Sequence, residues 1–598
     1  MADSDSDDSE SEGGLGNVSR VVMRPPGHSG KAKKGHLCFD AAFETGNLGR
    51  VDLINEYEYD LFIRPDTCNP RFRIWFHFTV DNIRLDQRVI FNIVNMSKKK
   101  NHLLDGMTPI VRSTTRPKWQ RLPNQVVHYY RSPEHRNHYV LSFTFAFDRE
   151  EEIYHFALCR PYSYSRCQAH LEQLDRKALP HVRREVLTVS LQHRRLDVLT
   201  ITASSNMDAP LNQRVVVILA RVHPGEAPAS FICQGLIDFL VSSHPIAVLL
   251  RDHVIFKVVP MMNPDGVFLG NQRCSLLGID LNRGWIDATP LSHPTLDAVQ
   301  NLLADLNQRK DVHLDFVFDI HAHTSLHGAF IYGNSYDDVY RFERHIVYPK
   351  LLAQNAEDFN SLDTMYNRDP KKAGTARRYL CATLKDSVNC YTLFASLHGY
   401  RRDSPPYFLN YSEEGYYRLG RNVARTYLDY YHVVGVIPLG LPVSPGALKR
   451  AGRRSRPRHR RRSRSWPSRE PRRRTPGGRL VALRPHQVQC YCVITSSSED
   501  DDEEAEAYFL AGRPFPPPRG LRTSPPRGLG LGAAQRAGPA RHLSPPGAPR
   551  ARRKVGGRDG FSPTYKNTNF PHTSDVRRDT GTAQLLAGTR GGDRDDEY

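Results

Sequence analysis

The sequence predicts an α/β protein in which an N-terminal antiparallel β-sandwich precedes a domain with a mixed sheet flanked by helices. The sandwich is predicted over residues 35–170, where apolar and polar side chains alternate with period two. The second domain is predicted over 171–435, where strand-like and helix-like segments alternate. Beyond residue 436 the chain is rich in arginine, proline and glycine, which indicates a disordered basic tail over 436–598.

The elements follow in chain order. Residues 1–34 open with MADSDSDDSESEGG, an acidic segment too poor in apolar residues to offset the entropy of ordering, so we expect disorder. In the sandwich, RFRIWFHFTV (71–80) and NHYVLSFTFAF (137–147) have the alternation of half-buried strands. In the second domain, QRVVVILARV (213–222) is a continuous apolar run, as expected for a strand covered on both faces.

The rest of the second domain keeps this alternation. After the strand at 213–222 we expect a helix at 229–243, a strand at 254–260, a helix at 294–307, a strand at 314–320, a helix at 338–355, a strand at 390–396 and a helix at 413–431.

Composition narrows the class of protein. At 598 residues the chain is long enough for two or three domains. No stretch reaches about 18 uninterrupted apolar residues, so we expect no membrane span. Ten scattered cysteines without a secretory leader are read as reduced thiols in the cytosol or nucleus.

Two strand ends carry candidate metal ligands. RVHPGEAP places His223 three residues before Glu226, directly after an apolar strand. FVFDIHAHT ends another apolar strand with His321. Two histidines and one carboxylate form a typical zinc site with an open position, and Asp319 could orient His321. The alternatives are a surface loop and histidines that only cap a strand.

Basic residues crowd the segment between these strand ends. NPDG is a tight turn signal. Asn282 and Arg283 suit a terminal carboxylate, because a guanidinium binds a carboxylate through two parallel hydrogen bonds. Arg273 could polarise a carbonyl. Each arginine could instead be an exposed surface charge.

The motifs HPGE, NPDG, GNQRCSLLGIDLNRGW and DIHAHT, in this order, resemble the M14-type zinc carboxypeptidases, specifically the cytosolic carboxypeptidases. The resemblance spans about residues 35–435 and includes the sandwich that precedes the catalytic domain in that family. It implies one Zn²⁺ per chain, held by His223, Glu226 and His321. It further implies that Asn282 and Arg283 hold the substrate's terminal carboxylate and that Arg273 stabilises the oxyanion.

The resemblance also implies a substrate class and a location. The family removes glutamates from polyglutamylated tubulin and from other acidic C-terminal tails. It is cytosolic and associates with microtubules, centrioles and basal bodies. An acidic leaving residue needs a basic pocket, and Arg377 lies roughly where the family carries its basic specificity residue. The alternative for Arg377 is an exposed arginine at a strand edge.

One position departs from the family. In the strand CYTLFAS, Phe394 stands where the family carries the glutamate that acts as general base. General acid–base catalysis contributes roughly 10²–10⁴ in rate, and a phenyl ring can neither accept nor deliver a proton. Glu413 and Glu414 are not evident replacements, and Asp386 precedes the strand by too many residues. We therefore expect zinc binding with poor or no hydrolysis. The second hypothesis is an inactive relative that binds polyglutamate tails without cleaving them.

The C-terminal tail contains two charged blocks that suggest further functions. The arginine-rich block from Lys449 to Arg474 could bind nucleic acid or acidic partners or act as a nuclear signal, but a solvated disordered tail is the favoured explanation. The acidic block from Glu499 to Glu506 resembles a polyglutamate substrate, so autoinhibition is conceivable.

Overall fold

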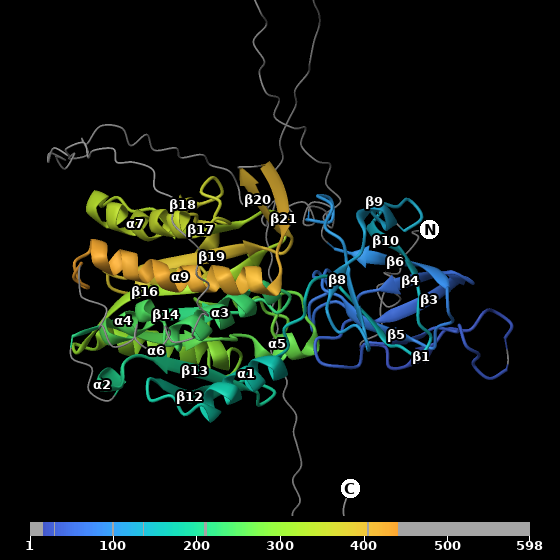
Figure 1. Cartoon of the computed structure of the whole chain (residues 1–598), viewed down its shortest axis with the longest axis horizontal. Helices are drawn as coiled ribbons and strands as arrows, with labels where there is room; N and C mark the ends of the chain where they lie inside the picture. Colours follow the sequence, from blue (N-terminus) through green and yellow to red (C-terminus); the bar gives the residue numbers. More distant parts are fainter. Residues whose placement is uncertain are drawn as a thin grey trace, which may run out of the picture. The chain divides into compact units, whose positions relative to one another are not determined.

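The computed structural model describes residues 16–28, 30–97, 101–135, 137–207, 212–403 and 406–439. The predictions for residues 1–15 and for the basic tail beyond 439, with its arginine-rich and acidic blocks, lie outside these ranges. The described chain forms an N-terminal sandwich and a second domain on an eight-stranded sheet (Figure 1).

The sandwich consists of a six-stranded and a five-stranded sheet. The first has the order β1 (Val21–Val22), β2 (Cys38–Asp40), β5 (His77–Asp81), β11 (Tyr154–Ala157), β7 (Ile110–Ser113), β8 (Gln120–Arg121). The second has the order β3 (Arg50–Asn55), β4 (Glu58–Phe62), β6 (Arg88–Met96), β10 (Tyr139–Ala146), β9 (Val127–Arg131).

The sandwich differs from the prediction in three details. Part of the segment 1–34, expected to be disordered, is ordered, because Val21–Val22 form β1 against β2. Neighbouring described strands are antiparallel except β4 and β6, which are parallel because the chain crosses to the other sheet through β5 before it returns. The strand expected at 71–80 begins only at His77. Upstream of His77 the backbone forms isolated hydrogen bonds to other segments instead of a strand ladder. For example, the Ser97 amide donates to the Arg73 carbonyl.

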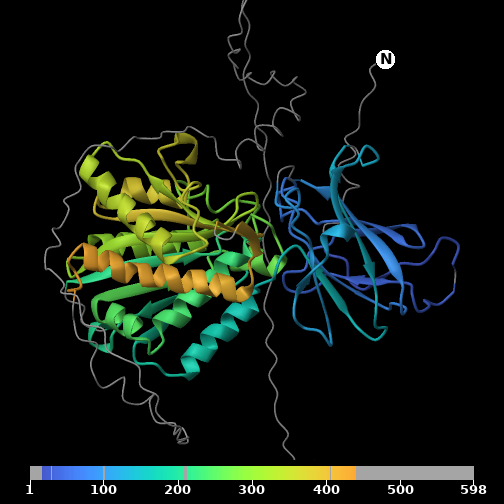
Figure 2. The same cartoon turned by 45° about the horizontal axis from the view of Figure 1, so that its top comes forward.

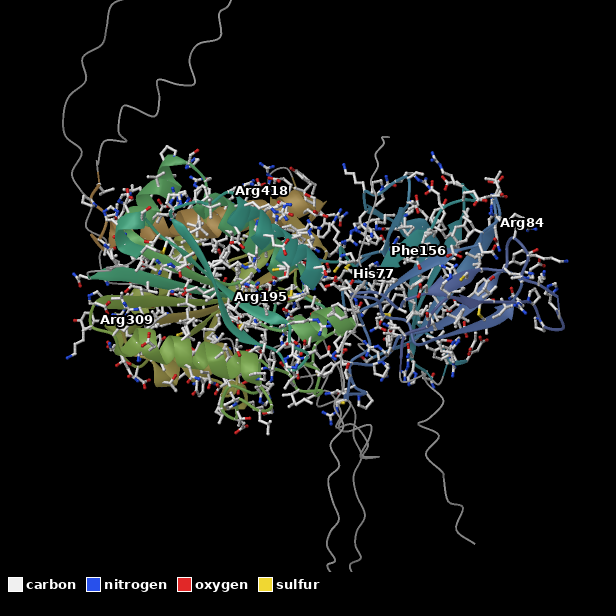
Figure 3. All side chains as sticks on the ribbon, turned by 90° about the horizontal axis from the view of Figure 1, so that it is seen from below. His77, Arg84, Phe156, Arg195, Arg309 and Arg418 are labelled. Atoms are coloured by element: carbon white, nitrogen blue, oxygen red, sulfur yellow. The ribbon has the colours of Figure 1, made fainter. Side chains whose placement is uncertain are left out.

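Aromatic rings fill the space between the two sheets. Phe156 and Phe78 stack with ring centroids 5.5 Å apart, and Phe91 from the other sheet meets Phe156 at 5.6 Å. Figure 3 labels Phe156 inside this layer, and its side chain is fully buried. Contacts of this kind explain the period-two pattern, because alternate side chains of each strand face the core.

The second domain is built on one mixed sheet. Its order is β12 (Val182–Val189), β13 (Arg195–Ile201), β15 (Val254–Val259), β14 (Gln213–Ala220), β16 (Val312–His323), β19 (Asn389–Ser396), β17 (Ala329–Asn334), β18 (Met365–Asn367). The four central strands, β15, β14, β16 and β19, are parallel. A hairpin follows, β20 (Gly399–Asp403) and β21 (Pro406–Asn410).

Helices accompany this sheet. They are α1 (Tyr164–Arg176), α2 (Ser204–Met207), α3 (Ala227–Leu240), α4 (Pro245–His253), α5 (Pro264–Leu269), α6 (Pro294–Gln308), α7 (Val339–Asn355), α8 (Ala376–Thr383) and α9 (Glu413–Val433), with short 3₁₀ turns at Asn124–Val126 and Pro370–Lys372. Helix α9, drawn in orange, lies across the sheet in both views (Figure 1, Figure 2).

Both faces of the central strands are covered. In β14, Val216 and Ile218 belong to the core that contains α3 and α9, whereas Val215 and Val217 belong to the core that contains α6 and α8. This arrangement explains the continuous apolar run. The eight elements expected between 213 and 431 are all present, with ends shifted by a few residues.

Among the described helices, none alone is long and apolar enough to cross a membrane. The bent pair α3–α4 meets that test by length and composition only. The eight described cysteines are all free thiols, as predicted for them.

Candidate metal centre and substrate site

The fold brings the two predicted strand ends together. β14 and β16 are parallel neighbours, with Ala220 opposite Ile320. His223 and Glu226 follow the end of β14, while His321 lies on β16 one residue past this register point. The three side chains converge as one buried group that could hold a metal ion.

The distances within this triad fit a small divalent cation. Glu226 Oε1 lies 2.6 Å from His223 Nδ1, and Glu226 Oε2 lies 3.0 Å from His321 Nδ1. The two Nδ1 atoms are 3.3 Å apart. Zinc bonds of about 2.0–2.1 Å in a tetrahedron place ligand atoms about 3.3 Å from each other. The donor set, two imidazoles and one carboxylate, is also the one zinc prefers in catalytic sites.

Two carboxylates hold the imidazoles in the orientation that a metal requires. Asp280 Oδ1 lies 3.0 Å from His223 Nε2, and Asp319 Oδ2 lies 2.7 Å from His321 Nε2. A proton on each Nε2 donates to its carboxylate and leaves the Nδ1 lone pair for a metal. The predicted orienting role thus fits Asp319, and Asp280 plays the same part for His223.

The triad is strongly coupled electrostatically. Burial by itself raises the pKa of the Glu226 carboxyl, but the two imidazoles outweigh burial and lower it below its usual range. Burial lowers the pKa of His321, but Asp319 and Glu226 outweigh it and raise the pKa well above the ordinary value. Metal binding therefore displaces a proton from this site.

Asp280 contacts several of the candidate site residues, and the sequence analysis did not predict it. Besides His223, its carboxylate accepts from Arg273 Nε at 2.6 Å and from the Asn282 amide at 2.8 Å. The signal was present in GNQRCSLLGIDLNRGW, where Asp280 lies between Arg273 and Arg283, two arginines that were already candidates. The sequence did not identify Asp280 as a site residue, because only the tertiary structure shows that this acid faces His223.

The predicted substrate residues lie on the same segment. Arg283 Nη1 donates to the Asn282 carbonyl at 3.2 Å, and 30% of the Arg283 side chain is exposed. Asn282 is buried, and its Oδ1 accepts from the Ala376 amide at 3.0 Å, which ties this segment to α8. Asp280 thus lies among Arg273, Arg283 and the metal ligand His223.

Arg377 is buried near the start of α8, so the alternative of an exposed strand-edge arginine is wrong. Its guanidinium donates to the Gly333 carbonyl at 2.6 Å, to Asn334 Oδ1 at 2.9 Å, and to the carbonyl and side chain of Asn367 at 3.3 and 3.0 Å. None of these acceptors is a carboxylate. Burial lowers the pKa of Arg377 to about 10.

Phe394 lies directly beside the candidate metal ligand His321. On β19 it is opposite His321, and their ring centroids are 5.6 Å apart. It also stacks on Phe330 at 5.4 Å and contacts Tyr332 at 4.9 Å. The ring is 8% exposed, so this position of the site is apolar.

The other acids considered as replacements point elsewhere. Glu413 pairs with Arg166 at 3.0 Å and Glu414 with Arg421 at 2.7 Å. Asp386 is mostly exposed and pairs with Arg341 at 2.6 Å. The expectation that none of the three takes over the role of the missing glutamate is consistent with these contacts.

Comparisons with known proteins bear on this geometry. Residues 167–403 match the family Zinc carboxypeptidase (peptidase M14), and residues 39–157 match the Cytosolic carboxypeptidase N-terminal domain. The human protein cytosolic carboxypeptidase 6 is 56% identical over 422 residues, which are 71% of this chain and 84% of the human one. The Caenorhabditis elegans protein of the same name is 40% identical and is covered to 91%.

A solved metallo-carboxypeptidase from Burkholderia cenocepacia shares the fold, with a TM-score of 0.57 at 21% identity over 67% of this chain and all of that one. His223, Glu226 and His321 all lie within the region that matches the zinc carboxypeptidases. This chain therefore belongs to the cytosolic carboxypeptidases, within the M14 family of zinc carboxypeptidases.

Proposed function

We propose that this chain is a zinc metallocarboxypeptidase for glutamate-rich C-terminal tails, polyglutamylated tubulin among them, whose turnover is limited by Phe394. The observation that carries the proposal is the convergence of His223, Glu226 and His321 beside a segment that carries Arg273 and Arg283. Cytosolic action and association with microtubules, centrioles or basal bodies belong to the same proposal.

One Zn²⁺ would be held by His223, Glu226 and His321, since their donor atoms and spacing fit it. When bound, zinc polarises a substrate carbonyl and lowers the pKa of a coordinated water toward about 7. The protein's part is to keep both imidazoles oriented, through Asp280 and Asp319.

The substrate's terminal carboxylate would bind Asn282 and Arg283. Arg283 is partly exposed, and a guanidinium forms paired hydrogen bonds with a carboxylate. Arg273 is directed by its Nε contact with Asp280, and we assign it the stabilisation of the oxyanion.

Arg377 would attract the glutamate side chain of the substrate. Its four described acceptors are neutral, so the charge is fixed in place without being cancelled by an acid. A buried positive charge of this kind favours an anionic partner.

Phe394 favours a second candidate function, binding without cleavage. It provides no proton acceptor where the family has one, and Glu413, Glu414 and Asp386 are each paired with an arginine. An inactive relative would retain zinc and affinity for polyglutamate tails.

The test compares the natural chain with Phe394→Glu on a peptide that ends in several glutamates, with released glutamate as the readout. We expect turnover to rise by about 10²–10⁴ in the variant. Peptide binding, measured by calorimetry, should be present in both proteins.

Equal and robust turnover by both proteins would show that the proton acceptor lies elsewhere. Binding by both with release by neither would favour the second candidate. No binding of a polyglutamate peptide by either protein would refute the substrate class.

A further inference from the structure

We propose that His102, His327 and His398 form a second metal site, which takes Zn²⁺ and joins the sandwich side of the chain to two loops of the catalytic domain. One ring nitrogen from each lies within 4.8 Å of the other two. The three residues come from distant segments: the turn after residue 100, the loop between β16 and β17, and the turn between β19 and β20.

Each of the three rings carries a buried nitrogen without a hydrogen-bond partner among the described residues. These atoms are His102 Nδ1, His327 Nε2 and His398 Nδ1. His102 and His398 are 2% and 6% exposed. An unsatisfied buried polar atom costs roughly 1–3 kcal/mol, so three of them together need an explanation. A shared cation would satisfy all three.

The hydrogen bonds of His102 prepare it for a metal. Its Nε2 lies 3.2 Å from the His323 carbonyl and 2.9 Å from Ser396 Oγ. A carbonyl can only accept, so Nε2 carries the proton and Nδ1 keeps its lone pair. Metal-bound histidines in proteins usually show this arrangement, with the second nitrogen donating to a carbonyl or carboxylate.

A metal binds the neutral form of imidazole. Burial lowers the pKa of His102 to about 2 and that of His398 to about 3, with further lowering by neighbouring histidines and, for His398, by Arg121. These directions agree with the geometry, in which the rings crowd together with centroids 4.8–5.8 Å apart. Three crowded imidazoles with free lone pairs favour zinc, copper or nickel over magnesium or calcium.

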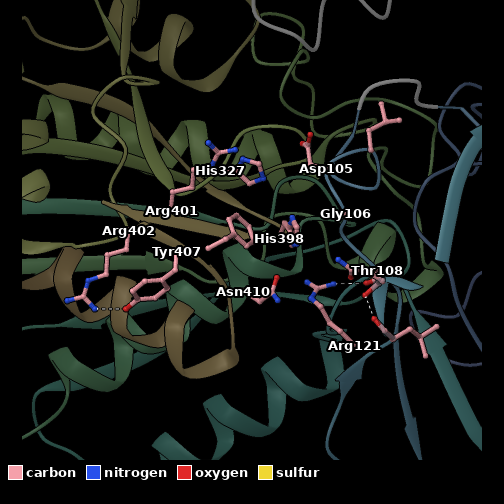
Figure 4. Close-up of a pocket in the computed structure, with 14 residues that line it drawn as sticks. Asp105, Gly106, Thr108, Arg121, His327, His398, Arg401, Arg402, Tyr407 and Asn410 are labelled. Carbon is pink, nitrogen blue, oxygen red and sulfur yellow. Dashed lines mark hydrogen bonds between the residues drawn. The ribbon is translucent and has the colours of Figure 1, made fainter. Parts of the chain in front are cut away.

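The site lies at the edge of a pocket of about 970 Å³, which His327 and His398 line together with Asp105 (Figure 4). Asp105 Oδ2 is 3.7 Å from His102 Nδ1, so we assign it the fourth coordination position. Four ligands without an open position are typical of structural zinc. Donor atoms of a tetrahedral zinc site lie roughly 3.3 Å apart, so bound zinc would draw together the three rings, whose donor atoms lie within 4.8 Å of one another.

The test is a count of metal per chain. The full chain is stripped with chelator and loaded with Zn²⁺ alone, and elemental mass spectrometry follows gel filtration. We expect two zinc ions for the natural protein, one for His327→Ala/His398→Ala, one for His223→Ala/His321→Ala, and none for the quadruple variant. The matched control His128→Ala removes an exposed histidine from β9 and should keep two.

Equal zinc contents for the natural protein and for His327→Ala/His398→Ala would overturn the second site. If the double variant does not fold, His327→Gln replaces it, and an unchanged zinc affinity would refute the proposal, since we expect a loss of tenfold or more. X-ray absorption spectroscopy on zinc-loaded His223→Ala/His321→Ala should show three imidazoles, and a shell without imidazole counts against the site. If zinc content instead falls in His327→Ala/His398→Ala but does not change in His223→Ala/His321→Ala, the proposed function is refuted and the second site stands. The two failures are therefore distinguishable.

Discussion

Asp280 contacts both a candidate metal ligand and a candidate substrate residue, although we assign it neither role. It orients His223 through Nε2 and holds Arg273 through Nε. We expect Asp280→Asn to weaken zinc binding by about 10–100-fold, because residues that orient a ligand have effects of this size. Competition with a zinc-sensitive dye measures the change.

Asp305→Asn is the control, since this acid is exposed on α6 away from the triad, and it should leave the affinity unchanged. Equal zinc affinities for Asp280→Asn and Asp305→Asn would mean that His223 keeps its orientation without Asp280.

Arg377 allows a residue-scale test of specificity. Arg377→Gln should weaken binding of a peptide that ends in glutamate by about 30-fold or more, because removal of one partner of a buried charge pair costs 2–5 kcal/mol. A peptide that ends in glutamine should lose much less. Calorimetry on both peptides gives the difference, and Arg84→Gln, an exposed arginine of the sandwich, is the matched control.

Equal losses for the two peptides would assign Arg377 a purely structural role, through its bonds to Asn334 and Asn367. A lower thermal stability with unchanged peptide preference would lead to the same assignment.

The elements were predicted better than the contacts between them. His223, Glu226 and His321 could be inferred because they lie at or just past the ends of strong apolar strands, and parallel strands carry their ends to one edge of the sheet. Asp280 could not be inferred, because nothing in the local pattern of an acid between arginines shows which side chain it faces. The same holds for His327 and His398, whose loops meet His102 only through the packing of the sandwich against the catalytic domain.

The pair α3–α9 depends on glycine at its closest approach. A Cβ added to Gly420 of α9 would lie 2.1 Å from the Ile232 carbonyl oxygen of α3, and one at Gly235 would lie 2.4 Å from Tyr417 Cα. These neighbours are backbone atoms and cannot turn aside. We expect Gly420→Ala to lower the free energy of unfolding by about 3 kcal/mol, at the upper end of overpacking effects, as measured in urea.

Gly415→Ala is the control in the same helix. Its Cβ would meet side-chain atoms, the Tyr411 ring at 3.2 Å and Ser412 Oγ at 3.6 Å, and side chains can move aside. Alanine also favours the helix over glycine by up to about 1 kcal/mol. The stability of this variant should change by less than about 1 kcal/mol. If Gly420→Ala changed the free energy of unfolding as little as Gly415→Ala, the close backbone approach of α3 and α9 at Gly420 would be contradicted.

At the scale of the whole molecule, one buried carboxylate of the sandwich holds the loop that carries Arg273. Asp66, 3% exposed, accepts from the amides of Gln272, Arg273 and Cys274 at 2.5, 2.7 and 2.7 Å. Arg64 adds a bond from Nη2 to the Leu269 carbonyl at 2.5 Å. The N-terminal domain therefore contributes to the substrate site through the backbone of this loop.

Asp66→Ala would leave the amides of Gln272, Arg273 and Cys274 without this acceptor, at about 1–3 kcal/mol for each unsatisfied buried amide, so we expect a loss of roughly 3–9 kcal/mol in urea unfolding. We also expect one unfolding transition for the natural chain and two for Asp66→Ala, because the two domains of the variant would lose much of their coupling. Asp52→Ala, at a half-exposed position of β3, should change stability by less than about 0.5 kcal/mol. We further expect Asp66→Ala to lose polyglutamate binding, because Arg273 would be displaced. A single transition at an unchanged midpoint, with polyglutamate binding retained, would show that the sandwich does not support the loop.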